Sequence, residues 1–121
     1  MTGVRPVRKG VPPEPEGAES DEAVDRELIT RWLGGDQRAA TSLVERHAAA
    51  LSRFAAAMGG ASGSDVDELV QDTFVRAFNS LESFRGESSL RTWLFTIERR
   101  LMLDRRRAER RRPEKVQVAE A

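Results

Sequence analysis

The 121-residue sequence has no cysteine and a single histidine, His47. Without cysteine there is neither a disulfide framework nor a thiolate metal site, and one histidine cannot build a metal centre alone, so we expect no metal and no cofactor. The sequence also lacks an apolar run long enough to span a bilayer, and its basic opening, MTGVRPVRKG, is not followed by the apolar segment of a signal peptide. These absences predict a cytoplasmic protein without membrane insertion.

Net charge is also absent, because twenty basic residues balance twenty acidic ones. The two signs are nevertheless separated along the chain. Residues 14–36 contain eight acidic and two basic residues, whereas residues 99–115 contain nine basic and three acidic residues. A local excess of positive charge of this size is typical of a surface that binds a polyanion, and nucleic acid is the commonest one.

The chain has room for one small domain. Residues 1–20 hold four of the five prolines and show no periodic apolar pattern that could bury surface, so we predict a disordered N-terminal tail. We assign residues 21–112 to a helical domain. Residues 113–121 are expected to form a C-terminal tail or the start of a linker.

Two amphipathic helices are predicted in the first half of the domain. In residues 21–33 apolar side chains recur at three- and four-residue spacing up to Gly34-Gly35, a pair that tolerates the positive φ of a helix end. Asp36 can cap a second helix, whose apolar stripe covers residues 40–58, and we expect the two helices to pair as a hairpin. His47 lies on this stripe, which favours a core histidine with a satisfied hydrogen bond over a chemical role.

The third helix has the most regular pattern. Ser64 or Asp65 can cap it, and its apolar face repeats at i, i+3, i+4, i+7 and onward, as only an amphipathic helix does. The face comprises Val66, Leu69, Val70, Thr73, Phe74, Ala77, Phe78 and Leu81.

A fourth helix follows the turn ESFRGESS, in which Gly86 gives conformational freedom and Ser88 or Ser89 can cap the helix. We expect it to continue to about Arg112, where Pro113 stops it. Its apolar stripe is Leu90, Leu94, Ile97 and Leu101. Because no strand pattern is present, the predicted fold is all-α, a compact bundle of about four helices. The predicted core residues are Trp32, Phe54, Phe74, Phe78, Leu94 and Ile97.

Arginines on the fourth helix form the first candidate functional surface. Helical spacing places Arg99, Arg106 and Arg110 on one line, and Arg100, Arg107 and Arg111 on the adjacent line. Such lines can follow a phosphate backbone, with affinity that falls steeply as salt rises. The alternative is a solvated helix end whose arginines only complement the helix dipole.

The turn before that helix is the second candidate. It offers small polar side chains, free backbone N–H groups and one positive charge, between Phe84 and the nearby Trp93. Such a loop can hold an unstacked base by its edge while an aromatic platform stacks on it, which suggests single-stranded or melted DNA. Its residues are Phe84, Arg85, Gly86, Glu87, Ser88 and Ser89. Taken alone, the turn is more typical of a simple connection that joins two helices and packs into their core.

The third candidate is the polar face of the third helix. Glu68, Gln71 and Asp72 lie within one turn of each other and could dock on a basic partner helix through charge-assisted hydrogen bonds. Acid-base catalysis is disfavoured, because no nucleophile, metal ligand or pocket histidine accompanies the carboxylates. We therefore do not expect an enzyme.

Three segments together resemble region 2 of the extracytoplasmic-function (ECF) group of bacterial sigma factors, from about Asp25 to Arg112. They are DRELITRWLGGDQRAATSLVERHAAALSRFA, DVDELVQDTFVRAFNSLESFRGESSLRTWL and the arginine-rich close. The resemblance implies a transcription initiation factor domain that binds core RNA polymerase and recognises and helps melt the promoter minus-ten element.

The resemblance also implies roles for individual positions. Glu68, Gln71 and Asp72, with Arg76 nearby, would dock on the clamp helices of the largest polymerase subunit. The loop 84–89 would capture a base flipped from the non-template strand of the minus-ten element. Trp93 would lie in the segment associated with strand opening, and the helix with Arg99 and Arg100 would approach the upstream edge of that element.

The sequence departs from the family pattern in places. Many relatives have asparagine where this chain has Arg100, and often tyrosine where it has His47. Region 4, which follows region 2 in full members, is absent from the sequence, through truncation or natural absence. Two other hypotheses stay open: an adaptor or decoy that binds polymerase or an anti-sigma factor without promoter-specific activity, and a small non-specific nucleic-acid binder.

Overall fold

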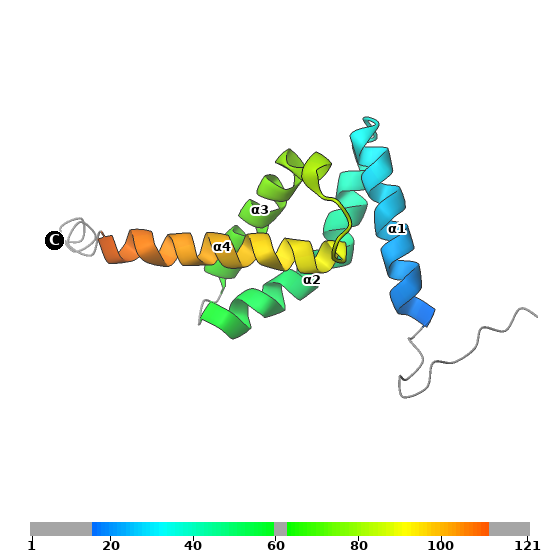
Figure 1. The fold of residues 1–121 in the computed structure, drawn as a ribbon. Helices are drawn as coiled ribbons and strands as arrows, with labels where there is room; N and C mark the ends of the chain where they lie inside the picture. The colour runs from blue at the N-terminus through cyan, green and yellow to red at the C-terminus, as the bar shows by residue number, and fades with distance from the viewer. Residues whose placement is uncertain (1–15, 60–62, 112–121) are drawn as a thin grey trace, which may run out of the picture.

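The structure, a computed structural model, describes residues 16–59 and 63–111. In chain order its elements are α1 (Glu16–Leu33), α2 (Arg38–Gly59), α3 (Ser64–Asn79), the short 3-10 helix η1 (Leu81–Ser83) and α4 (Leu90–Arg111). α4 packs on both α2 and α3, and α1 packs on α2 (Figure 1). The described residues contain no strand, which confirms the predicted all-α bundle of four helices.

The N-terminal end of the fold differs from the prediction. α1 begins at Glu16, so residues 16–20, which we assigned to a disordered tail, are helical. Periodicity misses this first part of α1, because it depends on an apolar face and the segment EGAES has none. The remaining part of the predicted tail, residues 1–15, lies outside the described residues.

α1 and α2 form the predicted hairpin. The turn between them places Gly35 at a φ of 102°, the left-handed conformation that glycine adopts without strain. The Asp36 N–H donates to the Arg31 carbonyl at 2.9 Å and closes the end of α1. The Asp36 carboxylate in turn accepts from the Arg38 N–H at 3.0 Å, which confirms that it caps α2.

α3 buries the face that its periodicity predicts. Six of the eight predicted residues are buried within α3, Phe78 is half-buried, and Leu81 is buried but belongs to η1. The predicted cap is wrong. Gly63 precedes the helix with a φ of 59° and no side-chain cap hydrogen bond, while Ser64 and Asp65 lie inside the first turn. Asp65 there favours the positive end of the helix dipole without capping it.

α4 begins as predicted but buries a different row of side chains. The Ser89 hydroxyl accepts from the Thr92 N–H at 3.1 Å, which confirms the serine cap. The buried residues of α4 are Leu90, Leu94, Glu98 and Met102. Ile97 and Leu101, which we expected in the stripe, are only half-buried. The buried row follows i, i+4, i+8 and i+12, as expected of a helix whose i±4 ridge packs into its neighbours. The predicted stop at Pro113 lies outside the described residues.

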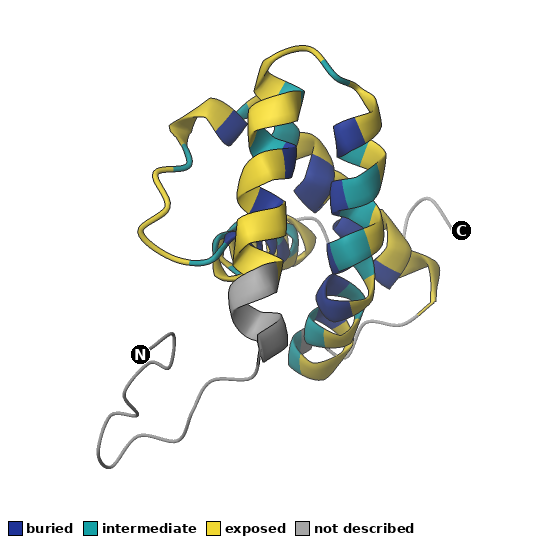
Figure 2. Cartoon of the chain, turned by 90° about the vertical axis from the view of Figure 1, so that its right-hand side faces the viewer, coloured by how far each residue is buried: buried dark blue, intermediate teal, exposed yellow. Residues whose placement is uncertain are grey.

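The core lies where the four helices meet, and it faces inward on every helix (Figure 2). Of the predicted core residues, Phe74 and Leu94 are buried, whereas Trp32, Phe78 and Ile97 are half-buried against the core. Phe54 is also half-buried, and its ring stacks on Phe95 with centroids 4.5 Å apart. The tilted pair Trp32–Phe78, at 5.0 Å, joins the end of α1 to α3.

Candidate functional site

The connection between η1 and α4 keeps its polar groups at the surface. Arg85, Gly86, Glu87 and Ser88 are exposed, and Gly86 adopts a φ of 75°. Ser89 is partly buried, because its hydroxyl caps α4. The Ser88 hydroxyl donates to the neighbouring Ser89 carbonyl at 3.0 Å. The loop therefore has a defined shape while most of its side chains face solvent.

Two aromatic rings flank this loop. Phe84 and Trp93 are both half-buried, and their ring centroids lie 5.2 Å apart at an interplanar angle of 51°. The tilted geometry is a favourable one for two aromatic rings. The rings thus join the core at one edge and keep part of their surface at the base of the loop. The packing role that the sequence offered is therefore observed, and the platform for a base stays a prediction.

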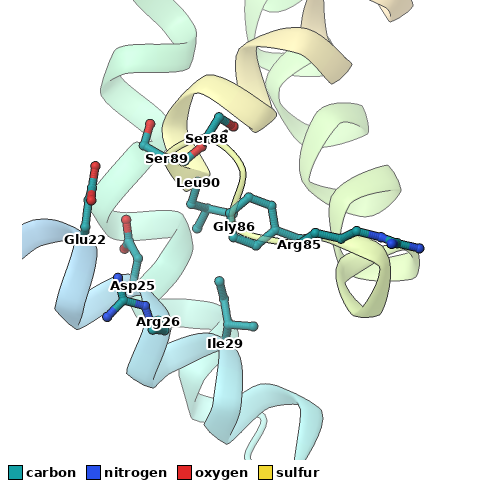
Figure 3. Close-up of a pocket in the computed structure, with 10 residues that line it drawn as sticks. Glu22, Asp25, Arg26, Ile29, Arg85, Gly86, Ser88, Ser89 and Leu90 are labelled. Atoms are coloured by element: carbon teal, nitrogen blue, oxygen red, sulfur yellow. Dashed lines mark hydrogen bonds between the residues drawn. The ribbon is translucent and has the colours of Figure 1, made fainter.

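A pocket of about 280 Å³ lies between the loop and α1 (Figure 3). Its lining residues are Glu22, Asp25, Arg26 and Ile29 from α1, with Phe84, Arg85, Gly86, Ser88, Ser89 and Leu90 from the loop and the start of α4. This size is below that of typical sites for drug-sized ligands and suits one flat ring system. We predicted the loop wall, but the contribution of α1 was missed.

A hydrogen-bond network that starts at Asp25 joins α1, α2 and α4 beside this pocket. The Asp25 carboxylate accepts from Arg46 Nε at 2.7 Å and from His47 Nε2 at 3.0 Å. Arg91, at the start of α4, donates from Nε to His47 Nδ1 at 3.2 Å and from Nη2 to the Arg46 carbonyl at 3.1 Å. Because a guanidinium can only donate, His47 carries its proton on Nε2. His47 is only 2% exposed, which confirms the predicted core histidine with satisfied hydrogen bonds.

The ionisation of Asp25 reflects these partners. Burial opposes the charged form, but hydrogen bonds from His47 and Arg46, together with the positive charge of Arg46, outweigh it and lower the pKa of Asp25 below its ordinary value. The charged network thus fixes α1 against the start of α4, on the two sides of the pocket. Asp25 and Arg91 were not singled out in the sequence, because their meeting depends on contacts between distant segments.

The polar face of α3 is exposed as predicted. Glu68, Gln71, Asp72 and Arg76 are all exposed on one side of the helix. Arg105 of α4 reaches this face, where it pairs with Asp72 and lies 3.7 Å from a Glu68 carboxylate oxygen. Arg105 was not among the predicted site residues. Because all three side chains are partly exposed, solvent screens the pairs and each contributes at most about 1 kcal/mol.

The arginines of α4 divide into two groups. Arg106 donates to the Met58 carbonyl at 3.0 Å and closes the end of α2, and Arg107 lies 3.5 Å from the Asp104 carboxylate. Within residues 21–58 and 63–111, no acidic side chain pairs with Arg99, Arg100 or Arg110, and all three are exposed. The end of α4 extends beyond the other helices (Figure 1), so its arginines are accessible to a long polyanion.

Glu98 is the residue least expected from the sequence. It is 0% exposed in the middle of α4, and neither carboxylate oxygen has a hydrogen-bond partner among the described residues. Burial raises the pKa of Glu98 to about 7. The signal available in the sequence was its position four residues after Leu94 and four before Met102, on the row that the i±4 packing buries.

In the part of the chain that the structure describes, no group of three histidine or carboxylate side chains is placed to hold a metal ion. No helix there is long and apolar enough to cross a bilayer.

Comparison with known proteins places these features in a family. Residues 43–112 match the family Sigma-70 region 2. The chain is 43% identical over 88 residues to the RNA polymerase sigma factor NccH of Alcaligenes xylosoxydans xylosoxydans, covering 73% of this chain and 47% of the relative. It is 35% identical over 98 residues to the ECF RNA polymerase sigma-E factor of Haemophilus influenzae, covering 78% and 49%. The chain belongs to the ECF group of the sigma-70 family. It spans about half the length of these relatives.

Proposed function

We propose that the chain is a transcription initiation factor domain that binds core RNA polymerase and recognises and helps open the promoter minus-ten element, without catalysis of its own. The observation that carries this proposal is that a polar loop with a pocket beside it leads directly into α4, which presents a series of accessible arginines. The names of the relatives, which describe RNA polymerase sigma factors, support the same function. Because core polymerase and promoter DNA are in the bacterial cytoplasm, the protein would act there.

The polar face of α3 is the proposed docking surface for polymerase. Its two carboxylates, Glu68 and Asp72, flank Gln71, and Arg76 follows one turn later. Basic side chains on the clamp helices of the largest subunit would form charge-assisted hydrogen bonds with the carboxylates. Arg105 already holds Asp72 and approaches Glu68, so it orients both carboxylates before the partner arrives.

The loop and α4 form the proposed promoter-binding surface. Arg99, Arg100 and Arg110 would contact phosphates, each contact releasing condensed counterions. The pocket beside the loop would take a base extruded from the non-template strand. Extrusion costs a few kcal/mol, and stacking on Phe84, which lines the pocket and packs on Trp93, can return about 1–3 kcal/mol per base, with the phosphate contacts supplying the rest. The duplex is thus held by α4 while the loop takes the base.

The test uses Trp93 as a reporter. Because the sequence has two tryptophans, the Trp32→Phe variant leaves Trp93 as the only one. A sequence selected by this variant from a randomised single-stranded pool is titrated against its scrambled counterpart, and emission from Trp93 is recorded. We expect saturable quenching by the selected strand and binding weaker by about tenfold or more for the scrambled one.

Each competing function predicts a different outcome. An adaptor or decoy would bind core polymerase but show no preference between the selected and scrambled strands. A non-specific nucleic-acid binder would bind both strands and would not bind core polymerase. Either result contradicts the proposed function.

A further inference from the structure

One wall of the pocket belongs to α1, which the polymerase and promoter surfaces described above do not include. Glu22 and Arg26 lie one helical turn apart on α1 and line the α1 side of the pocket, while Ser88 and Ser89 line its loop side. Both α1 side chains are otherwise exposed. A base held by the loop would therefore also face α1.

The two ends of the pocket differ in polarity. In Figure 3 the side chains of Glu22, Ser88 and Ser89 lie at one end, and Ile29 lies at the opposite end with Arg26 beside it. Leu90 adds a further apolar group to the lining. A flat aromatic ring would bury its faces among the apolar groups and direct its hydrogen-bonding edge toward the polar end.

Glu22 is the acceptor available at that end. The pocket has two carboxylates in its lining, Glu22 and Asp25. Both oxygens of Asp25 are already bonded, one to Arg46 and the other to His47. No described residue forms an ion pair with Glu22. The hydrogen bonds of Asp25 hold α1 against α2 about one turn from Glu22. The backbone that carries the Glu22 carboxylate is therefore fixed.

An ionised carboxylate accepts hydrogen bonds and donates none, whereas the hydroxyls of Ser88 and Ser89 do both. A carboxylate placed opposite the exocyclic group of a base pairs with the amino group of cytosine or adenine. It repels the keto oxygen that replaces this group in uracil, thymine or hypoxanthine, where only the neighbouring ring N–H remains as a donor. It also repels nearby phosphates, so it weakens binding unless it meets a donor. Resting on the proposed base capture, we infer that Glu22 selects a captured base that carries an amino group on its Watson–Crick edge.

The experiment compares bases that differ in the amino and keto groups of that edge. Strands derived from the selected sequence carry cytosine or uracil, or adenine or hypoxanthine, at each position in turn. We compare the parent chain with Glu22→Gln and with Glu27→Gln, both in the Trp32→Phe background. Glu27→Gln is the matched control, because it removes the same charge from α1. Glu27 pairs with Arg31 at 3.2 Å and does not line the pocket.

At the captured position the parent chain and Glu27→Gln should prefer the amino base over its keto partner by about tenfold. In Glu22→Gln the preference should fall to about twofold or less, because an amide can accept from an amino group and also donate to a keto oxygen. Circular dichroism and core polymerase binding should stay unchanged in both variants.

The outcomes separate this inference from the proposed function. If the parent chain discriminates but Glu22→Gln keeps the same preference, base capture stands and the role of Glu22 is refuted. A preference of the parent chain for the keto base also refutes the role of Glu22. So does a folded Glu22→Gln variant that binds all strands more weakly by the same factor. If the parent chain shows no base preference at any position, the proposed function itself fails.

Discussion

Replacing Glu98 by methionine should stabilise the protein, and more so at high pH. The ordinary pKa of 4.5 applies in the unfolded chain, and burial raises it to about 7 in the folded state. As pH rises through this window, the unfolded state loses its proton first, so the free energy of unfolding falls; below 4.5 this loss is absent. The full shift corresponds to about 3 kcal/mol at about 1.4 kcal/mol per pH unit.

Methionine suits the test because it is unbranched and adapts to an irregular core. It removes both the pH-dependent penalty and the unsatisfied carboxyl group, whose burial costs about 1–3 kcal/mol even when neutral. Glu98→Met should therefore be more stable than wild type at pH 5, and its advantage should grow by about 2 kcal/mol by pH 8.

The assay is urea unfolding followed by far-ultraviolet circular dichroism at pH 5 and pH 8. Glu45→Met is the matched control, because Glu45 is exposed in the middle of α2 and should show little change at either pH. An equal stability change for Glu98→Met at both pH values would show that the carboxylate does not titrate in the folded core. A loss of stability at both pH values would show that Glu98 makes favourable contacts in the folded state.

Further predictions concern DNA binding and the contacts that shape the site. Arg110→Ala should weaken binding to all DNA strands alike and lower the slope of log affinity against log salt concentration by about one phosphate contact, without changing stability. Arg106→Ala should weaken DNA binding in the same way and also destabilise the fold by about 1 kcal/mol, because it loses the hydrogen bond to the Met58 carbonyl. Salt titrations measure the DNA affinity and urea melts the stability. Asp25→Asn should lower the free energy of unfolding by about 3 kcal/mol at pH 7, because it removes a charged, hydrogen-bonded carboxylate. The difference from wild type should shrink as the pH falls through the lowered pKa of Asp25, because the wild-type carboxylate is then protonated. Urea melts down to pH 3 test this. Ser89→Ala should cost about 1 kcal/mol in the same melts through loss of the α4 cap.

Local patterns predicted the helices because each depends on residues close in sequence. The apolar face of α3 repeats so regularly that its buried side could be assigned residue by residue. The caps at Asp36 and Ser89 were also predictable, since a capping side chain bonds to a backbone N–H two or three residues away. His47 could be assigned to the core because its neighbours on the stripe are apolar.

What could not be predicted depends on how the helices pack. The burial of Glu98 follows from the row of α4 that faces its neighbours, and the apolar side chains of Ile97 and Leu101 pointed to an adjacent row. The pairing of Arg105 with Asp72 joins residues on two different helices. The α1 wall of the pocket, with Glu22, exists only because the hairpin brings α1 beside a loop sixty or so residues later in the chain.

In the proposed function the α3 face binds polymerase independently of the loop that binds DNA. The direct measurement is the Kd for core RNA polymerase of the wild type, of the double variant Gln71→Arg with Asp72→Arg, and of the loop variant Glu87→Ala with Ser88→Ala. Charge reversal on α3 should weaken binding by about tenfold or more, while the loop variant should bind core polymerase like the wild type. Failure of the wild type to bind core polymerase, or an equal loss in both variants, would contradict the claim.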